Sequence, residues 1–189
     1  MKVLFVAAEG VPFSKTGGLA DVIGALRKEL KKAGVDVRVV LPKYGDTSEQ
    51  YVKEMELVHR FSVHVGWRNQ YCGVLRLEHD GVTFYFLDNE AHFKRPGTYG
   101  FFDDGERFAF FNRAVLDALP ALNFQPDLIH CHDWHAGMIP VMLTQYRNQA
   151  FYAPIKTIFT IHNLQYQGVF SKSILGDLLG LGWEHFNVN

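Results

Sequence analysis

The chain has 189 residues, 48 % of them hydrophobic, which suits one globular domain with a core of its own. Its net charge is −1 and acidic and basic residues are intermixed, which argues against nucleic acid or a membrane surface as a partner. Two cysteines, Cys72 and Cys131, are too few for a disulfide framework, and no stretch has the roughly eighteen apolar residues of a membrane span. We therefore expect a cytoplasmic protein.

The first forty residues predict a strand, a helix and a second strand. Residues 3–7 form a continuous apolar run, as in a parallel strand that is covered on both faces. Apolar residues recur at helical spacing over 19–32, Gly34 is a stop signal, and 35–41 is the next strand. Glu9 interrupts the apolar start and no cleavage-site pattern follows, so the start is not expected to be a signal peptide.

The middle of the chain has a different pattern. Residues 57–65, 71–79 and 82–87 are strand-like, and the last two flank the dipeptide Asp80-Gly81. Asp-Gly between two such runs is a strong signal for a tight hairpin. We expect an antiparallel insertion or edge in an otherwise parallel sheet.

The second half alternates helices and strands. Residues 104–119 have helical character, and 127–132 form a short buried strand. A helix is expected over 134–146, bent at Pro140, and another strand over 155–161. Strands that alternate with helices predict a doubly wound α/β domain with a mostly parallel sheet.

The loop between the first strand and the first helix contains Lys15, Gly17 and Gly18. Ligands of open α/β sheets bind outside the carboxyl ends of the strands, so this loop lies where a ligand would be. Glycines let the backbone approach a ligand, and a helix N-terminus favours an anion. A plain turn before a helix explains the glycines as well, and Asp21 in the first helical turn is equally explained by the helix dipole.

A polar block from His130 to His135 ends one strand and opens a helix. Its histidines and its aspartate suggest a metal, but Asp133 follows His130 by three residues rather than the four of the familiar zinc hydrolase pattern. Asp133 also suits a helix N-cap. Trp134 fits core packing or a platform for a sugar ring, because an aromatic face suits the apolar side of a pyranose.

Two further loops carry candidate residues. His162 and Asn163 directly follow a strand, where an imidazole and an amide suit hydrogen bonds to hydroxyl groups, although an ordinary polar loop is as good an explanation. The segment 95–100 presents Tyr99, with an ordinary loop as the favoured alternative.

Three segments, in this order, resemble the bacterial glycogen synthase and plant starch synthase family: 9–22, with its Lys-Thr-Gly-Gly-Leu signature, 130–136 and 160–170. The resemblance covers the whole chain, 1–189. It implies the N-terminal, Rossmann-like lobe of a two-lobed GT-B glycosyltransferase, with the C-terminal nucleotide-binding lobe absent. Such enzymes move glucose from ADP-glucose to the non-reducing end of an α-1,4-glucan such as glycogen, with retention and with no metal or other cofactor.

The resemblance also assigns roles around the first loop. Lys15, together with Gly17 and Gly18, would approach the diphosphate and the glucose of the donor. Asp21 would be a weaker member of the same binding site.

The remaining roles fall on the later loops. His162 would hold the glucosyl hydroxyls and place its backbone carbonyl near the anomeric carbon. Asp133 and Asn163 would position donor or acceptor hydroxyls. Trp134 would line the acceptor side, and Tyr99 would sit over the cleft. His162 and Asp133 are thus the expected catalytic residues.

Other functions stay open at this point. A glucan-binding module without catalysis, a metal-dependent hydrolase built on the histidines, and a related transferase with another sugar donor are the alternatives. The family's Arg–Lys pair that neutralises the leaving diphosphate lies in the absent lobe, so we expect the isolated chain to be inactive. An exposed sheet edge or apolar face would also allow the chain to associate with another copy of itself.

Overall fold

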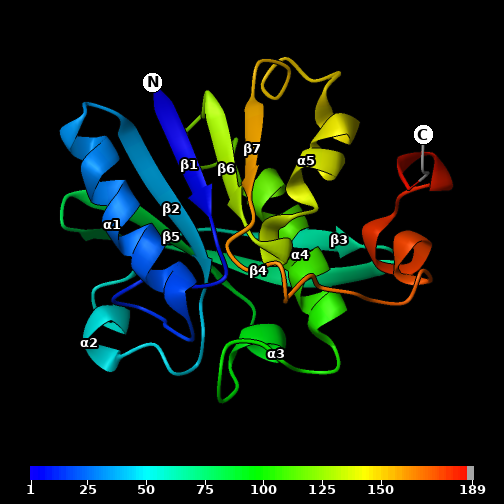
Figure 1. The fold of residues 1–189 in the computed structure, drawn as a ribbon, viewed down its shortest axis with the longest axis horizontal. Helices are drawn as coiled ribbons and strands as arrows, with labels where there is room; N and C mark the ends of the chain where they lie inside the picture. Colours follow the sequence, from blue (N-terminus) through cyan, green and yellow to red (C-terminus); the bar gives the residue numbers. More distant parts are fainter. Residues whose placement is uncertain (187–189) are drawn as a thin grey trace.

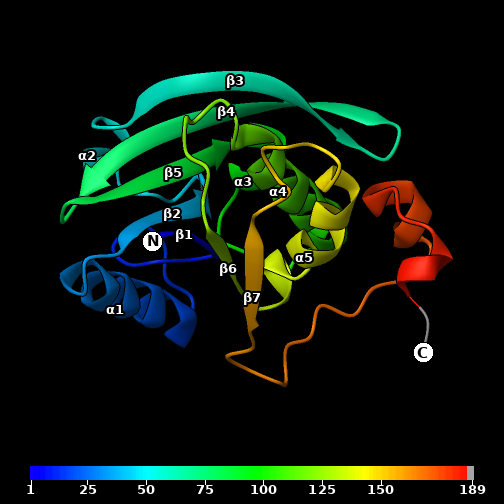
Figure 2. The same cartoon turned by 90° about the horizontal axis from the view of Figure 1, so that it is seen from above.

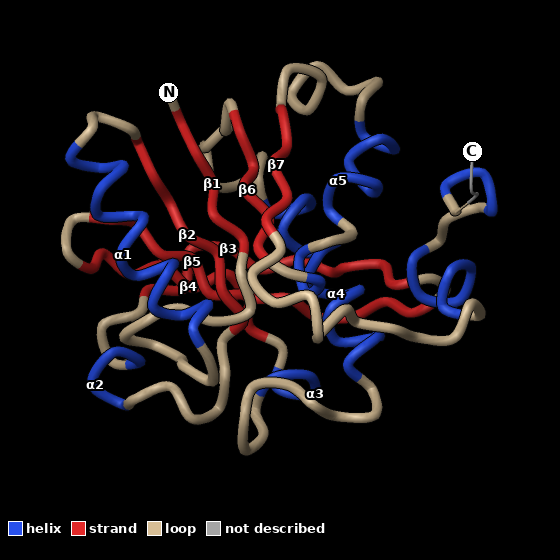
Figure 3. Tube along the Cα trace, viewed as in Figure 1, coloured by secondary structure: helices blue, strands red, loops and turns tan. Residues whose placement is uncertain are grey.

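The computed structural model describes residues 1–186 and places strands from both halves of the chain in one sheet (Figure 3). Its seven strands lie in the order β3-β4-β5-β2-β1-β6-β7. They are β1 (Lys2–Val6), β2 (Asp36–Pro42), β3 (Glu56–Val65), β4 (Arg68–His79), β5 (Val82–Asp88), β6 (Leu128–His132) and β7 (Lys156–Thr160).

Helices cover both faces of this sheet, with α1 on one side and α4 and α5 on the other (Figures 1 and 2). The helices are α1 (Gly18–Lys32), α2 (Glu49–Val52), α3 (Glu90–Phe93), α4 (Asp104–Ala118) and α5 (Ile139–Met142). Short helical turns of 3-10 or π type occur at Trp134–Ala136, Leu143–Tyr146, Leu175–Leu179 and Trp183–His185.

The sheet is parallel across β5, β2, β1, β6 and β7, while β3 and β4 add an antiparallel edge. The predicted hairpin joins β4 to β5, and both of its turn residues are left-handed, with φ of 51° at Asp80 and 66° at Gly81. Positive φ at both central residues is what a two-residue hairpin turn requires. The predicted fold class, a mostly parallel doubly wound sheet with an antiparallel hairpin, is confirmed.

Two hydrophobic cores lie on the two faces of the sheet. Alternate residues of a strand point to opposite faces, so Val3 and Phe5 of β1 belong to the core under α1. Leu4 and Val6 belong to the larger core with α4 and α5. A strand that is buried on both faces accounts for the continuous apolar run at the start of the sequence.

The helix expected over 134–146 is wrong. The segment forms a 3-10 turn, the short helix α5 and a second 3-10 turn. Pro140 lies in the first turn of α5, where its missing N–H is tolerated, whereas in the interior of one longer helix it would remove a backbone hydrogen bond. The short helices α2 and α3 were not predicted from the sequence.

After β7 the chain runs as a loop past the start of α4 and then lies beside α4, near the turn between β3 and β4 (Figure 1). There the turn Leu175–Leu179 contributes buried leucines to the larger core. Arg68 at the start of β4 forms an ion pair with Asp177, with 3.2 Å between Nη2 and Oδ2. Within residues 1–186 no helix is both long and apolar enough to cross a membrane.

Candidate active site

Three of the four loops that carry predicted site residues leave one edge of the sheet. They follow β1, β6 and β7, which are adjacent and parallel, so their carboxyl ends lie together. In open α/β sheets this edge is where ligands bind.

The loop after β1 is organised by Glu9, a residue that was not among the predicted site residues. Its side chain is fully buried, and its carboxylate accepts the backbone N–H groups of Thr16 and Gly17, the latter at 3.1 Å. These are the last amides before α1 begins at Gly18. The chain's own carboxylate therefore occupies these two amides. The only sign of this role in the sequence was that an acidic residue, Glu9, interrupts an apolar run.

Lys15 and Asp21 form an ion pair at the surface above this loop. Both carboxylate oxygens of Asp21 lie 2.8 Å from the ammonium nitrogen, and both side chains are more than half exposed. Exposed pairs of this kind contribute about 0–1 kcal/mol, so Lys15 can leave Asp21 at little cost when a ligand anion is near. A Cβ added at Gly18 would meet no atom within 4 Å, so the space beside that residue is open.

Asp133 joins the ends of β6 and β7. Its backbone N–H donates to the carbonyl oxygen of Thr160 at 2.9 Å, and its Oδ1 accepts the backbone N–H of His162 at 2.7 Å. The predicted N-cap role is wrong: Asp133 precedes the 3-10 turn, but its side chain makes no cap bond and reaches to the neighbouring loop. Its backbone is left-handed, with φ 57° and ψ 177°, a conformation that strains any residue except glycine.

The histidines of β6 and of the loop after β7 form hydrogen bonds with neighbouring side chains. His132 Nδ1 lies 2.9 Å from His162 Nε2, and His130 Nε2 lies 2.7 Å from the hydroxyl of Thr160. Burial, with help from the other two imidazoles, lowers the pKa of His132 to about 2. Among the described residues, no group of three His, Cys, Asp or Glu side chains is arranged to hold a metal ion.

Trp134 is half-buried and packs against other aromatic rings, as the core-packing interpretation expects. Its indole stacks on the imidazole of His135, with ring centroids 4.0 Å apart, and packs against Phe170. Gly168 has a φ of 63°, and a Cβ there would lie 2.5 Å from the indole, so the loop after β7 passes directly over Trp134. The indole also forms one wall of a largely apolar pocket of about 460 Å³.

The loop that carries Tyr99 is tied to the loop after β1. The hydroxyls of Thr98 and Thr16 form a hydrogen bond, and the buried guanidinium of Arg107 donates to the carbonyl oxygen of Thr98 at 2.9 Å. The ring of Tyr99 lies 4.5 Å from that of His135. Burial raises the pKa of Tyr99 to about 12, so its hydroxyl is protonated and able to donate at neutral pH.

Asn163 stands apart from this network. It is exposed, and its side-chain oxygen accepts the backbone N–H of Gln165 at 2.9 Å, which closes a turn within its own loop. The structure thus joins His162 to Asp133, and Tyr99 to the first loop, while the side chain of Asn163 serves its own turn.

The family model for the starch synthase catalytic domain matches residues 2–189. The chain belongs to this family. The glycogen synthases of Anoxybacillus flavithermus and Desulforamulus reducens are each 60 % identical to this starch synthase domain over its whole length. The chain covers 39 % and 40 % of those two proteins, so it spans about two fifths of the curated relatives that it matches.

A solved structure of the same family has the same fold. The catalytic domain of starch synthase IV from Arabidopsis thaliana, bound to ADP and acarbose, matches 96 % of this chain with a TM-score of 0.88 and 32 % identity. The match covers 38 % of that protein's chain. The resemblance inferred from the three loops is confirmed, and with it the Rossmann-like fold of a GT-B starch synthase domain.

Proposed function

We propose that this chain is the N-terminal catalytic domain, residues 1–189, of an ADP-glucose-dependent glycogen synthase whose nucleotide-binding lobe is not part of it. The observation that carries the proposal is the fixed position of His162 at the carboxyl edge of the sheet, in a chain 60 % identical to glycogen synthases over its whole length. The reaction replaces the bond between the anomeric carbon and the diphosphate of ADP-glucose by a bond to the 4-hydroxyl of an α-1,4-glucan, and the hydroxyl proton leaves with ADP.

His162 and Asp133 are the proposed catalytic residues. Asp133 uses Oδ1 to hold the backbone of His162, so the imidazole and the backbone carbonyl of His162 reach the substrate in a fixed orientation. Its second oxygen remains to accept a hydrogen bond from a sugar hydroxyl.

The other proposed contacts surround the same edge. Lys15 supplies a mobile positive charge for the diphosphate, Trp134 offers an aromatic face to the acceptor, and Tyr99 offers a protonated hydroxyl. The proposed substrate-binding residues are Lys15, Gly17, Gly18, Asp21, Tyr99, Trp134 and Asn163.

The proposal includes glycogen and ADP-glucose as substrates, no cofactor, and the cytoplasm as the place of action. Both cysteines, Cys72 and Cys131, are free and buried, and unpaired thiols are typical of proteins from reducing compartments.

A chimaera tests this function. Residues 1–189 replace the corresponding part of the Anoxybacillus flavithermus glycogen synthase, and incorporation of labelled glucose from ADP-glucose into glycogen is measured. We expect an active chimaera and no incorporation by the isolated chain, because fixed positive charge at a leaving group is worth about 10²–10³ in rate. The chimaera with Lys15→Gln is the matched variant and should lose at least tenfold in rate.

Two results would contradict the proposal. A folded chimaera that fails to elongate glycogen while the parent enzyme does so would remove the assigned function. Elongation by the isolated chain would show that the missing lobe is not required.

A further inference from the structure

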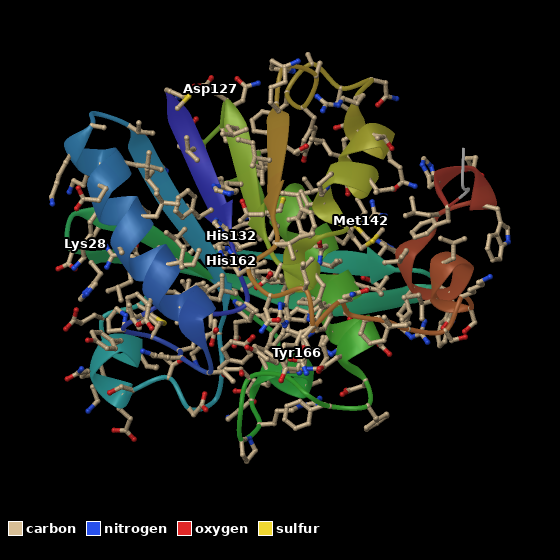
Figure 4. All side chains as sticks on the ribbon, viewed as in Figure 1. Lys28, Asp127, His132, Met142, His162 and Tyr166 are labelled. Atoms are coloured by element: carbon tan, nitrogen blue, oxygen red, sulfur yellow. The ribbon has the colours of Figure 1, made fainter. Side chains whose placement is uncertain are left out.

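The imidazole of His132 contacts the imidazole of His162. His132 ends β6 and is fully buried, whereas His162 is half-buried in the loop after β7. The distance of 2.9 Å between His132 Nδ1 and His162 Nε2 is that of a hydrogen bond, and the two rings are nearly parallel, with 13° between their planes. Figure 4 shows the two labelled side chains next to each other at the ends of their strands.

The protonation of His132 is fixed by its surroundings. Burial, together with the nearby imidazoles of His130 and His162, keeps its pKa far below neutral, so the ring is uncharged. A neutral imidazole has one nitrogen that donates and one that accepts. The hydrogen bond to His162 therefore has two possible directions, and each sets the position of the proton on both rings.

The second nitrogen of His132 decides between these directions. Nε2 is buried and has no hydrogen-bond partner among the described residues. A proton on Nε2 would leave a buried N–H donor unpaired, which is rarer in proteins than an unpaired acceptor. With the proton on Nδ1, the donor is satisfied by His162, and only a lone pair stays without a partner.

We propose that His132 is a positioning residue that donates from Nδ1 to Nε2 of His162 and so holds His162 as the neutral Nδ1–H tautomer. Asp133 fixes the backbone N–H of the same residue, so the ring and the backbone of His162 are held by two separate contacts. On the proposed function, and resting on it, the Nδ1–H of His162 is the donor offered to a hydroxyl of the glucosyl group. The tautomer itself does not depend on that function.

Nitrogen-15 NMR of the 189-residue chain at pH 7.5 measures the tautomer directly. Long-range proton–nitrogen correlations should show a protonated Nδ1 and an unprotonated Nε2 for His162, with the signals assigned from a His162→Gln variant. In His132→Phe the hydrogen bond is lost, and His162 should shift toward the Nε2–H form that imidazole prefers in water. His132→Asn places an amide donor where Nδ1 lies and should restore the Nδ1–H form.

His130→Gln is the matched control, since His130 lies on the same strand but bonds to the hydroxyl of Thr160. It should leave the tautomer of His162 unchanged. An Nε2–H imidazole or an imidazolium at His162 in the native chain would overturn the proposal, as would an unchanged tautomer in folded His132→Phe. If His132→Phe does not fold, the native chain and His132→Asn decide the matter. An inactive chimaera with the Nδ1–H form intact would count against the proposed function alone.

Discussion

At the scale of single residues, Glu9 has a structural role in the loop after β1. Its side chain is fully buried, and its carboxylate accepts two backbone N–H groups just before α1. Hydrogen bonds to a charged group contribute about 1.5–3 kcal/mol each, and losing this acceptor leaves two partly buried hydrogen bonds unmade. Glu9 therefore fixes the loop that carries Lys15.

We expect Glu9→Ala to lower the free energy of unfolding by about 2–4 kcal/mol, and Glu9→Gln by less, since its amide keeps one acceptor. Urea unfolding measures both changes, and amide exchange at Thr16 and Gly17 should become faster in Glu9→Ala. Asp21→Asn is the control: it removes an exposed ion pair and should cost at most about 1 kcal/mol. Equal effects of Glu9→Ala and Asp21→Asn would contradict this role.

Asp133 has a strained backbone and also makes a side-chain hydrogen bond to His162. Two substitutions measure these two effects separately. Asp133→Ala keeps the left-handed backbone and loses the bond to His162, so it should destabilise the fold by about 1–3 kcal/mol. Asp133→Gly loses the same bond but relieves strain of about 1–3 kcal/mol. We expect the glycine variant to be the more stable of the two in urea unfolding. An alanine variant as stable as the glycine variant would show that the strain is negligible.

Whether the role of each of these residues could be predicted depends on how far apart in the sequence its contacts lie. The positions of Lys15 in the first loop and of Asp21 in the first turn of the helix were predicted correctly, because consecutive elements of the chain fix them locally. Their ion pair was not predicted. The contacts of Glu9 and Asp133 were not predicted, because each joins segments that meet only in the folded chain. The link from Asp133 to His162 spans 29 residues of sequence and depends on the pairing of β6 with β7.

At the scale of elements, the β4–β5 hairpin is fastened to α1 through Asp80. This turn residue forms ion pairs with the buried Arg27 and with Lys28. Hydrogen bonds from Lys28 and Arg27 lower the pKa of Asp80 below its ordinary value. A carboxyl group whose pKa is lowered by folding stabilises the folded state at any pH above its ordinary pKa. This contribution is lost as the pH falls through the pKa of the folded state.

We therefore expect Asp80→Asn to unfold at a lower urea concentration than the native chain at pH 7. The difference should shrink as the pH falls below about 4, where the native carboxylate itself becomes protonated. Glu29→Gln, which removes an exposed pair within α1, should show a smaller difference at pH 7. A difference for Asp80→Asn that persists at pH 2 would contradict this explanation.

The strands β1, β2, β5 and β6 were predicted within a few residues because each is a short, mostly apolar run bounded by turn residues. The hairpin was predicted because Asp80-Gly81 permits the left-handed turn. The prediction of one helix over 134–146 failed for a different reason. The apolar spacing of this stretch is helical, but that spacing reflects burial against α4 rather than one continuous helix, and Pro140 restarts the helix instead of bending it.

At the scale of the whole molecule, the sheet order leaves β7 as an edge strand opposite β3. Adjacent strand residues point to opposite faces, and on β7 both Ile158 and Phe159 are nearly half exposed, at 47 % and 44 %. An edge strand with unpaired backbone groups and exposed apolar side chains on both faces is a template for pairing with another chain. We therefore predict that the self-association expected from the sequence uses the β7 edge.

Sedimentation velocity of the 189-residue chain over a range of concentrations should show a concentration-dependent dimer or larger species. Ile158→Lys places a charge on the exposed edge and should shift the chain to monomer at concentrations where the native chain associates. Leu57→Lys on β3 is the matched control, because Leu57 is also 47 % exposed and lies on the opposite edge strand. A native chain that stays monomeric throughout would contradict self-association, and a larger effect of Leu57→Lys would move the contact to the β3 edge.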